Sequence, residues 1–290
     1  MLTAVDVARG PGFSVSAVTC VADHPELSPP ETKASHGLVL VRRGWFRRHV
    51  AGTPSTVDPT VAYLGLPGEQ ESFAHPAGGD ECTSVTLSPD LWRQLAGDPG
   101  RPERTSVYVD APLELAHRRL IAAAASGDTD HALPEELLTL AGAAIRRAVA
   151  GPIPAGAAAA PRARAKDAAL AAAARDAIAA DHPAARGLFP LAELLGVSPY
   201  RLSRGFSREL GMSLTHYRNR ARVSRALERL AGGERSLGIL AADLGFADQA
   251  HLTRTVRAQV GHTPSALRRL LQALEARCRG QPWPSTGCGT

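Results

Sequence analysis

The chain has 290 residues and a formal net charge of +5, and it is long enough for two domains with separate hydrophobic cores. It contains no uninterrupted apolar run of about 18 residues and no positively charged start before an apolar stretch. We therefore expect neither membrane insertion nor secretion, but a cytoplasmic protein. The four cysteines, Cys20, Cys82, Cys278 and Cys288, lack any CxxC spacing and are predicted to be reduced thiols.

Charge divides the chain into an acidic and a basic part. Residues 1–160 hold 13 Arg and Lys against 18 Asp and Glu, whereas residues 161–290 hold 20 against 10. The second part therefore has a net charge of +10, which favours a polyanion such as a nucleic acid as its partner.

The first 88 residues have the pattern of short β-strands separated by turns. Residues 12–21 alternate apolar and polar side chains, and residues 37–50 form two strand-like stretches hinged at Gly44. Short strands with frequent Pro and Gly turn signals predict a compact β-barrel or sandwich over about residues 10–88. Further strands are expected over residues 61–66, 71–74 and 82–87.

Helical periodicity follows the strands. We expect helices over residues 90–96, 112–125 and 134–150. These helices either form a dimerisation surface or cover the barrel, because amphipathicity indicates a buried face and not its partner. Residues 151–161 are rich in Pro, Gly and Ala and predict an interdomain linker. An alanine-rich helix is expected to follow over residues 162–180.

One pattern occurs twice in the basic part of the chain. Residues 191–211 and 240–261 each combine a short apolar helix, a glycine turn and a second helix, which is the pattern of a helix-turn-helix. The copies are offset by 49 residues at Gly196 and Gly245 and by 50 residues beyond the turn, so the second turn has one extra residue. Between the copies, residues 214–230 predict one long helix that holds the two modules apart.

Each second helix is expected to start at a capping residue, Ser198 or Asp248. The i,i+4 pairs Leu202/Phe206 and Leu252/Val256 predict its buried stripe, so the opposite face is exposed. That face has side chains able to meet base edges in a major groove. These side chains are Tyr200, Ser203 and Arg204 in the first copy, and Ala250, His251 and Arg254 in the second.

At these residues the sequence resembles the AraC/XylS family of bacterial transcription regulators. The resemblance covers roughly the last third of the chain, and it implies base reading by Tyr200, Ser203, Arg204, Ala250, His251 and Arg254. Many members carry an aromatic residue where this chain has Leu252 and Val256. The matching residues are Arg222, Ala226, Leu230, Gly245, Phe246, Leu252, Thr253, Arg254, Gly261, His262, Thr263, Pro264 and Arg268.

The resemblance also implies a cupin-like jelly-roll sensor before the DNA-binding part. The run from Phe73 to Thr83 looks like a segment found in a subset of the family. We name His36, His49 and His75 as candidate effector-binding residues, but the chain has no His-x-His pair, so no metal and no cofactor is assigned. Cys82 lies beside Asp80 and Glu81, which favours a buried inert thiol over a redox sensor.

Together these patterns predict an α+β protein. A cupin-like sensor or dimerisation domain (1–150) is followed by a linker (151–161), a double helix-turn-helix domain (162–279) and a disordered tail (280–290). The function hypothesis is a non-enzymatic, sequence-specific transcription regulator. The alternative is a cupin-type enzyme with a helical adaptor.

Double-stranded DNA is the expected partner of the regulator, with RNA polymerase, a small-molecule effector and a second copy of the chain as further candidates. Base contacts fall to the six residues named above. Phosphate contacts are assigned to Arg201, Arg208, Arg218 and Arg257.

Overall fold

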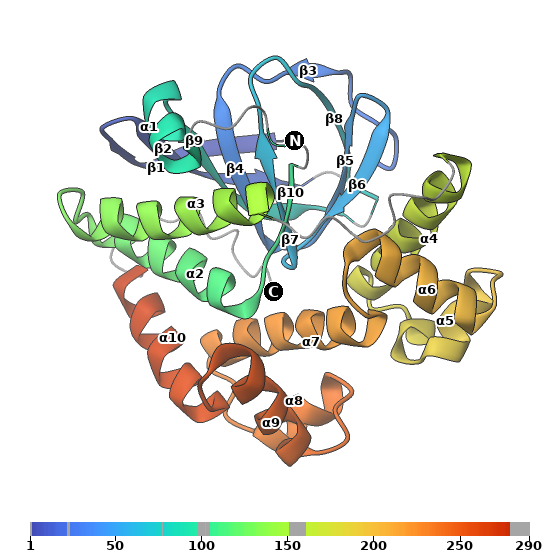
Figure 1. Ribbon diagram of the computed structural model, residues 1–290. Coiled ribbons are helices and arrows are strands. Elements are labelled where there is room, and N and C mark those ends of the chain that lie inside the picture. Colours follow the sequence, from blue (N-terminus) through green and yellow to red (C-terminus); the bar gives the residue numbers. More distant parts are fainter. Residues whose placement is uncertain are drawn as a thin grey trace.

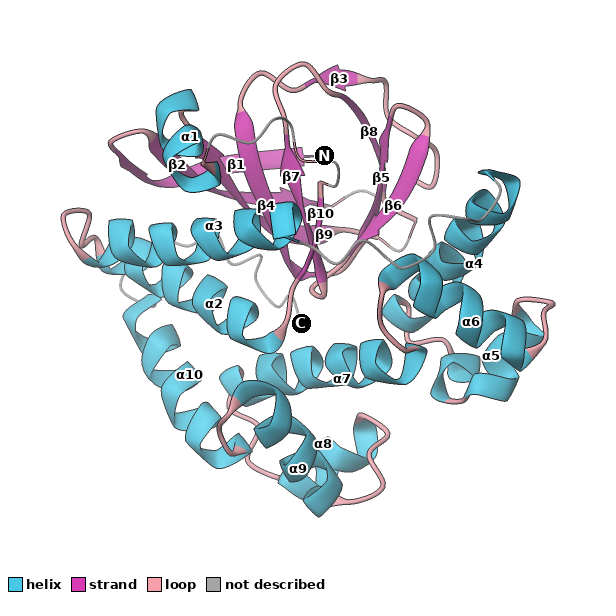
Figure 2. Ribbon diagram, in the orientation of Figure 1, coloured by secondary structure: helices cyan, strands magenta, loops and turns pink. Residues whose placement is uncertain are grey.

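The computed structural model describes residues 2–21, 24–76, 78–97, 102, 105–150 and 161–278. Strands gather in the N-terminal part and helices make up the C-terminal part, as Figures 1 and 2 show. This confirms the mixed α and β composition and its order along the chain. None of the described helices combines the length and apolar character needed to cross a membrane.

The strands form two antiparallel sheets. Their orders are β1-β2-β9-β4-β7-β10 and β3-β8-β5-β6. The first sheet comprises β1 (Leu2–Gly10), β2 (Phe13–Cys20), β4 (His36–Arg43), β7 (Val61–Gly65), β9 (Asp80–Leu87) and β10 (Ser106–Tyr108). The second comprises β3 (Glu31–Thr32), β5 (Phe46–Val50), β6 (Thr53–Val57) and β8 (Gln70–Ala74).

All of the predicted strands are present, and the hinge between β4 and β5 lies at Gly44, whose φ is +78°. β1, β3, β6 and β10 were not predicted, and β1 and β10 extend the strand region beyond the expected limits of 10–88. The closed barrel was also an expectation. Within the described residues no strand ladder joins the two sheets, so the structure shows a pair of sheets and not a closed barrel.

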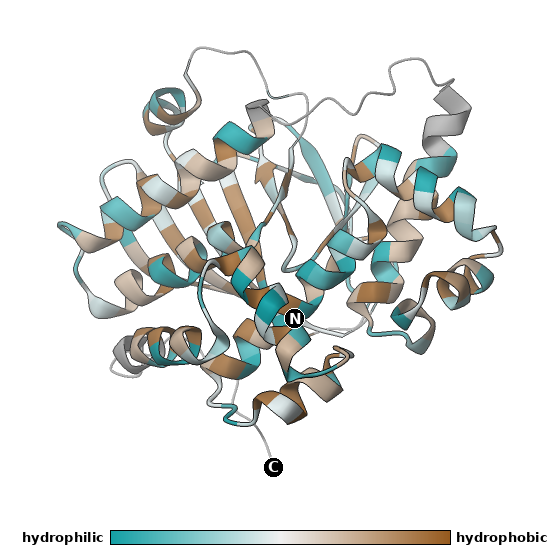
Figure 3. Ribbon diagram, turned by 60° about the horizontal axis from the view of Figure 1, so that its bottom comes forward, coloured by the Kyte–Doolittle hydropathy of each residue, from teal (hydrophilic) through white to brown (hydrophobic). Residues whose placement is uncertain are grey.

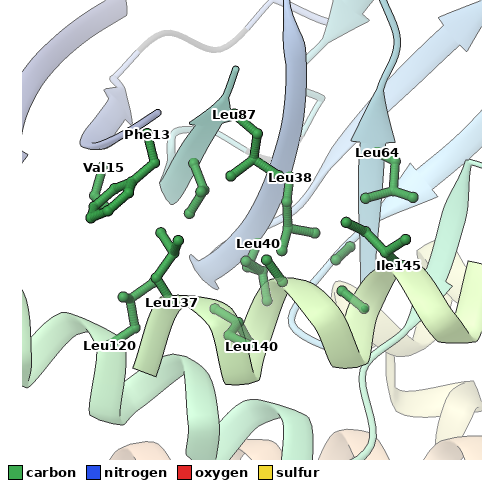
Figure 4. Packing of buried hydrophobic residues seen from close by; sticks show 14 of the residues in the cluster. Phe13, Val15, Leu38, Leu40, Leu64, Leu87, Leu120, Leu137, Leu140 and Ile145 are labelled. Atoms are coloured by element: carbon green, nitrogen blue, oxygen red, sulfur yellow. The ribbon is translucent and has the colours of Figure 1, made fainter. Parts of the chain in front are cut away.

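The six-stranded sheet is covered on both faces. Three helices lie on one face, namely α1 (Pro89–Ala96), α2 (Ala111–Ser126) and α3 (Ala132–Ala150). Leu140 and Ile145 of α3 lie beside Leu40 and Leu64 of the sheet, and Leu137 lies below Phe13 and Val15 (Figure 4). The other face contributes side chains to a second buried cluster shared with the four-stranded sheet. That cluster comprises Val39, Val41, Phe46, Val57, Tyr63 and Cys82.

The C-terminal part is helical. The predicted long connecting helix is α7, and the predicted alanine-rich helix is α4. The linker 151–161 falls largely on residues outside those described, as does the tail 280–290. The helices are α4 (Pro161–Ala179), the short 3-10 helix η1 (Pro183–Arg186), α5 (Leu188–Leu194), α6 (Pro199–Leu210), α7 (Leu214–Ala231), α8 (Leu237–Asp243), α9 (Gln249–Val260) and α10 (Pro264–Cys278).

The two parts of the chain contact each other. Helix α2 lies against α7, α9 and α10, and its Ala111 and Leu115 belong to the same buried cluster as the apolar residues of those helices (Figure 1). In Figure 3, apolar residues gather between the helices and the sheet, and hydrophilic residues occupy much of the outer faces. The helical part is therefore held against the strand-rich part partly by apolar burial.

Replacing Leu140 by Ala tests the packing of α3 on the sheet. Leu140 is 1% exposed, so Leu140→Ala should lower the free energy of unfolding by about 2–5 kcal/mol through lost burial and the cavity left behind. Leu138 of the same helix is 45% exposed, and Leu138→Ala should change the free energy of unfolding by less than about 0.5 kcal/mol. Urea unfolding measures both. Equal losses for the two variants would contradict this arrangement.

Candidate nucleic-acid interface

The duplicated segments fold into two similar helix pairs, α5–α6 and α8–α9. The turn glycines Gly196 and Gly245 have φ of +64° and +70°, a left-handed conformation that favours glycine at both turns. As predicted, Ser198 caps α6, and its hydroxyl accepts a hydrogen bond from the Arg201 amide at 3.2 Å. Asp248 caps α9 by accepting one from the His251 amide at 2.6 Å.

The predicted buried stripe of each second helix is confirmed. Leu202 and Phe206 of α6 are fully buried, as are Leu252 and Val256 of α9. Phe206 packs edge-to-face on Tyr217 of α7, with ring centroids 5.4 Å apart. Because this stripe faces inward, the opposite face of each second helix lies at the surface.

Most of the predicted base-reading residues lie on those surfaces. Tyr200, Arg204, Ala250 and Arg254 are exposed, whereas Ser203 and His251 are half-buried. The Arg204 guanidinium donates to the Tyr200 hydroxyl at 2.6 Å, which joins two of these residues on α6. On α9, the His251 ring packs edge-to-face on Phe246 and its Nδ1 accepts from the Ala247 amide at 3.4 Å.

The predicted phosphate-binding arginines lie in different environments. Arg257 is exposed, but Arg201 and Arg208 are 3.5 and 3.2 Å from the carboxylate of Asp167 on α4. Arg218 is half-buried, and burial lowers its pKa. A phosphate would therefore compete with Asp167 for two of the four arginines.

Helix α7 connects the two pairs, and its faces have different partners. Its 18 residues span about 27 Å at 1.5 Å per residue. Val223, Leu227 and Leu230 pack into the cluster that holds the second helix pair. A polar stripe of α7 contacts the strand-rich part instead, and sequence reasoning did not identify this stripe as functional. Its contacting residues are Tyr217, Arg220 and Glu228.

Asp58 of the strand-rich part is the centre of one buried contact. The Tyr217 hydroxyl donates to its Oδ2 at 2.6 Å and accepts from Nε of Arg175, a residue of α4, at 3.1 Å. Arg175 itself lies 3.4 Å from the same Asp58 oxygen. Burial raises the pKa of Tyr217, and Asp58 adds to this, so the phenol stays protonated as the hydrogen-bond donor. All three side chains are less than about a tenth exposed.

Glu114 of α2 is the centre of a second contact. The buried Arg220 of α7 donates to its Oε2 at 2.6 Å and to the Val109 carbonyl at 2.9 Å, while Arg118 donates to Oε1 at 2.9 Å. Burial acts to raise the pKa of Glu114, but the two guanidinium groups outweigh it and lower that pKa. The carboxylate is therefore charged and shared between the two parts of the chain.

A cavity of about 230 Å³ adjoins this contact, and a second cavity of about 120 Å³ lies next to Asp58 and Tyr217. Arg43 and Glu228, 2.9 Å apart, line both cavities. The lining of the larger cavity mixes charged and apolar side chains from both parts of the chain. Among them are Arg42, Glu81, His117, Ile121, Ala231 and Leu271.

The three candidate effector-binding residues are spread over the strand-rich part. His36 begins β4 and stacks on Trp92 at 4.5 Å, His49 lies in β5, and His75 follows β8. None of the three lines either cavity described above. Cys82 is buried, and burial together with Asp80 raises the pKa of its thiol, in line with the inert thiol predicted from sequence.

Residues 191–270 match the family model of a helix-turn-helix domain. This segment is therefore a helix-turn-helix domain of the AraC type, which confirms for this part of the chain the family assignment made from sequence. No curated protein sequence matches the chain.

Solved structures with some likeness include regulators. Fatty-acid-bound ToxT from Vibrio cholerae is 10% identical with a TM-score of 0.37, covering 92% of this chain and 98% of that one. The C-terminal domain of AraT from Geobacillus stearothermophilus is 26% identical, with a TM-score of 0.30 over 38% of this chain and 86% of that one. An AraC-type regulator from Chromobacterium violaceum is 23% identical, with a TM-score of 0.33 over 37% and 96%.

His117 should make the protein sensitive to mild acid. Burial, with Arg42 and Arg118 nearby, lowers its pKa from 6.5 to about 3. Below pH 6.5 the imidazole therefore takes up a proton in the unfolded chain but not in the folded one. As the pH falls below 6.5, the free energy of unfolding decreases by about 1.4 kcal/mol per pH unit. Between pH 7 and pH 5 the wild type should lose about 2 kcal/mol more than His117→Gln. Denaturant titrations at both pH values measure this difference, and identical pH slopes would contradict it.

Proposed function

We propose that the protein is a sequence-specific DNA-binding transcription regulator. The observation that carries the proposal is that α6 and α9 both turn arginine-bearing faces to solvent within the segment that matches a helix-turn-helix domain. In this proposal α5–α6 and α8–α9 are two helix-turn-helix units. Their second helices enter successive major grooves, which lie about 34 Å apart on one face of B-DNA, and α7 holds them apart.

Arginine side chains supply the specific part of the contact. Arg204 and Arg254 read guanine through paired hydrogen bonds to O6 and N7. For Arg204 this requires giving up its bond to Tyr200, after which both side chains are available to the groove. Ser203, Ala250 and His251 lie beside them, and Arg201, Arg208, Arg218 and Arg257 hold phosphates.

We assign the strand-rich part, residues 1–150, to sensing or self-association through a cupin-like fold. The cavity of about 230 Å³ supports sensing, because a small molecule seated there touches α2 and α7 at once. A ligand that favours one arrangement of these helices shifts the population of that arrangement. Selection of bound duplexes from a random library, with and without cell extract, would report the operator and any effector dependence together.

Arg204→Ala and Arg254→Ala should each cost about 1–3 kcal/mol on the selected operator and relax the preference at one base pair. Arg257→Ala, which removes a phosphate contact, should weaken binding to all duplexes alike and reduce the salt slope by about one. Binding isotherms at several salt concentrations distinguish the two behaviours. An equal loss of affinity on every duplex for Arg204→Ala and Arg254→Ala would mean that these two arginine side chains contact only the sugar-phosphate backbone of the DNA.

The contact between Tyr217 and Asp58 should matter for DNA binding. The described arrangement leaves the α6 and α9 faces exposed, so we expect it to be competent for DNA, and loosening it adds an ordering cost to binding. Tyr217→Phe removes the hydroxyl that joins Asp58 to Arg175 and should weaken operator affinity by about fivefold or more.

The matched control for Tyr217→Phe is Tyr108→Phe. The Tyr108 hydroxyl is buried but makes no hydrogen bond among the described residues, so its loss should leave operator affinity unchanged. Fluorescence anisotropy with the selected duplex measures both variants. An unchanged affinity for Tyr217→Phe would show that docking of the strand-rich part is independent of DNA binding.

A further inference from the structure

Two residues that are close in the sequence, Cys20 and His24, meet a distant one, His75, at one end of the two sheets. Cys20 is the last residue of β2 in the six-stranded sheet, and His75 directly follows β8 in the four-stranded sheet. His24 and His75 pair backbone to backbone through hydrogen bonds of 2.8 and 3.3 Å, and their ring centroids are 4.5 Å apart. One ligand atom from each residue of this set, Cys20, His24 and His75, lies within 4.8 Å of the other two.

Each imidazole ring has an oxygen atom close to its Nδ1. Nδ1 of His75 lies 2.5 Å from the carboxylate of Asp80 but without hydrogen-bond geometry, and Nδ1 of His24 lies 3.4 Å from the Glu26 carbonyl. A ring that gives its Nδ1 hydrogen to a carboxylate or a carbonyl keeps the lone pair of Nε2 for a ligand. Metal-binding histidines in proteins are almost always held in this way.

The turn that delivers Asp80 is built for close approach. In the sheet register Cys20 lies opposite Asp80, and a Cβ at Gly79 would collide with the Cys20 carbonyl. Glycine at this position therefore allows the backbone just before Asp80 to lie against the end of β2. Cys20 and His75 are both buried, at 3% and 5% exposure, so the set is shielded from water.

We propose that Cys20, His24 and His75 form a structural zinc site. One thiolate and two imidazoles are the ligands that Zn²⁺ prefers, whereas Mg²⁺ and Ca²⁺ prefer oxygen. In a tetrahedral zinc site the ligand atoms lie about 3.6 Å apart, so binding requires the side chains to move inward by about 1 Å. A water molecule takes the fourth position.

The site would fasten the two sheets to each other. Its ligands come from β2 of one sheet, from the end of β8 of the other, and from the segment between β2 and β3. Because the ligands come from both sheets, we expect the ion to stabilise the fold.

Metal titration of the untagged full-length protein tests the proposal. After treatment with a chelator, the protein should bind one Zn²⁺ per chain, melt at a higher temperature with Zn²⁺ than without it, and show no such response to Mg²⁺ or Ca²⁺. Co²⁺ in place of Zn²⁺ should give a thiolate charge-transfer band in the near ultraviolet. Substoichiometric zinc with no thermal shift and no thiolate band would overturn the proposal.

Single substitutions test which residues bind the zinc ion. Cys20→Ser should abolish the cobalt thiolate band, and His24→Gln, at a half-buried position where a polar side chain is tolerated, should reduce zinc affinity at least about a hundredfold. Asp80→Asn should reduce it about 10- to 100-fold through the orientation of His75. Cys278→Ser and the exposed Asp90→Asn are the controls and should bind zinc as the wild type does. A wild-type thiolate band in Cys20→Ser, with circular dichroism showing a folded chain, would refute this ligand set.

Discussion

The contact between helix α7 and the strand-rich part determines how the rest of the molecule is arranged. Along one face α7 carries Tyr217, Arg220 and Glu228, which bind Asp58, Glu114 and Arg43 of the strand-rich part. Along another face its apolar residues form the core of the second helix pair. Residues of α7 belong to the buried clusters of both helix pairs. Any rotation of α7 relative to the sheets therefore moves both helix pairs with it.

The buried ion pairs of this contact define the orientation of α7 more than they add to the stability of the protein. Buried charges lose hydration when they pair, so a buried ion pair adds little net stability, although leaving one partner alone in the interface is costly. Apolar contacts such as those of Ala111 and Leu115 of α2 with the C-terminal cluster supply the attraction. The Asp58 and Glu114 networks then select the one alignment in which each charge finds its partner.

The sequence was most informative where local rules suffice. Periodicity, the capping residues Ser198 and Asp248, and the repeated turn glycines predicted both helix pairs and the extra residue in the second turn. It was less informative for strands, because β6 contains Pro54 and β10 has only three residues, so neither shows a clear alternation. Whether the sheets close into a barrel depends on long-range pairing, which no local pattern determines.

The interface and the proposed zinc site lay beyond what the sequence could predict for a related reason. Tyr217 and Asp58 are 159 residues apart, and nothing near either residue indicates the other. In the proposed zinc site Cys20 and His24 are near in sequence, but His75 lies 51 residues further on at the end of β8, so the set lacks the close His-x-His spacing by which metal sites are found in sequences. Such sites become visible only once the topology brings the strands together.

The uneven charge of the chain has two separate consequences in the fold. Arg175 and Arg220 belong to the basic part, but both are buried against carboxylates of the acidic part, so they contribute nothing to an outer basic surface. Several arginines that stay exposed, among them Arg204, Arg254 and Arg257, lie on the faces of α6 and α9. Salt screens exposed charges far more than buried pairs. Rising ionic strength should therefore weaken the contacts of α6 and α9 with a polyanion, while α7 stays docked on the strand-rich part. The charges that position the helices are thus different from the charges that bind the polyanion.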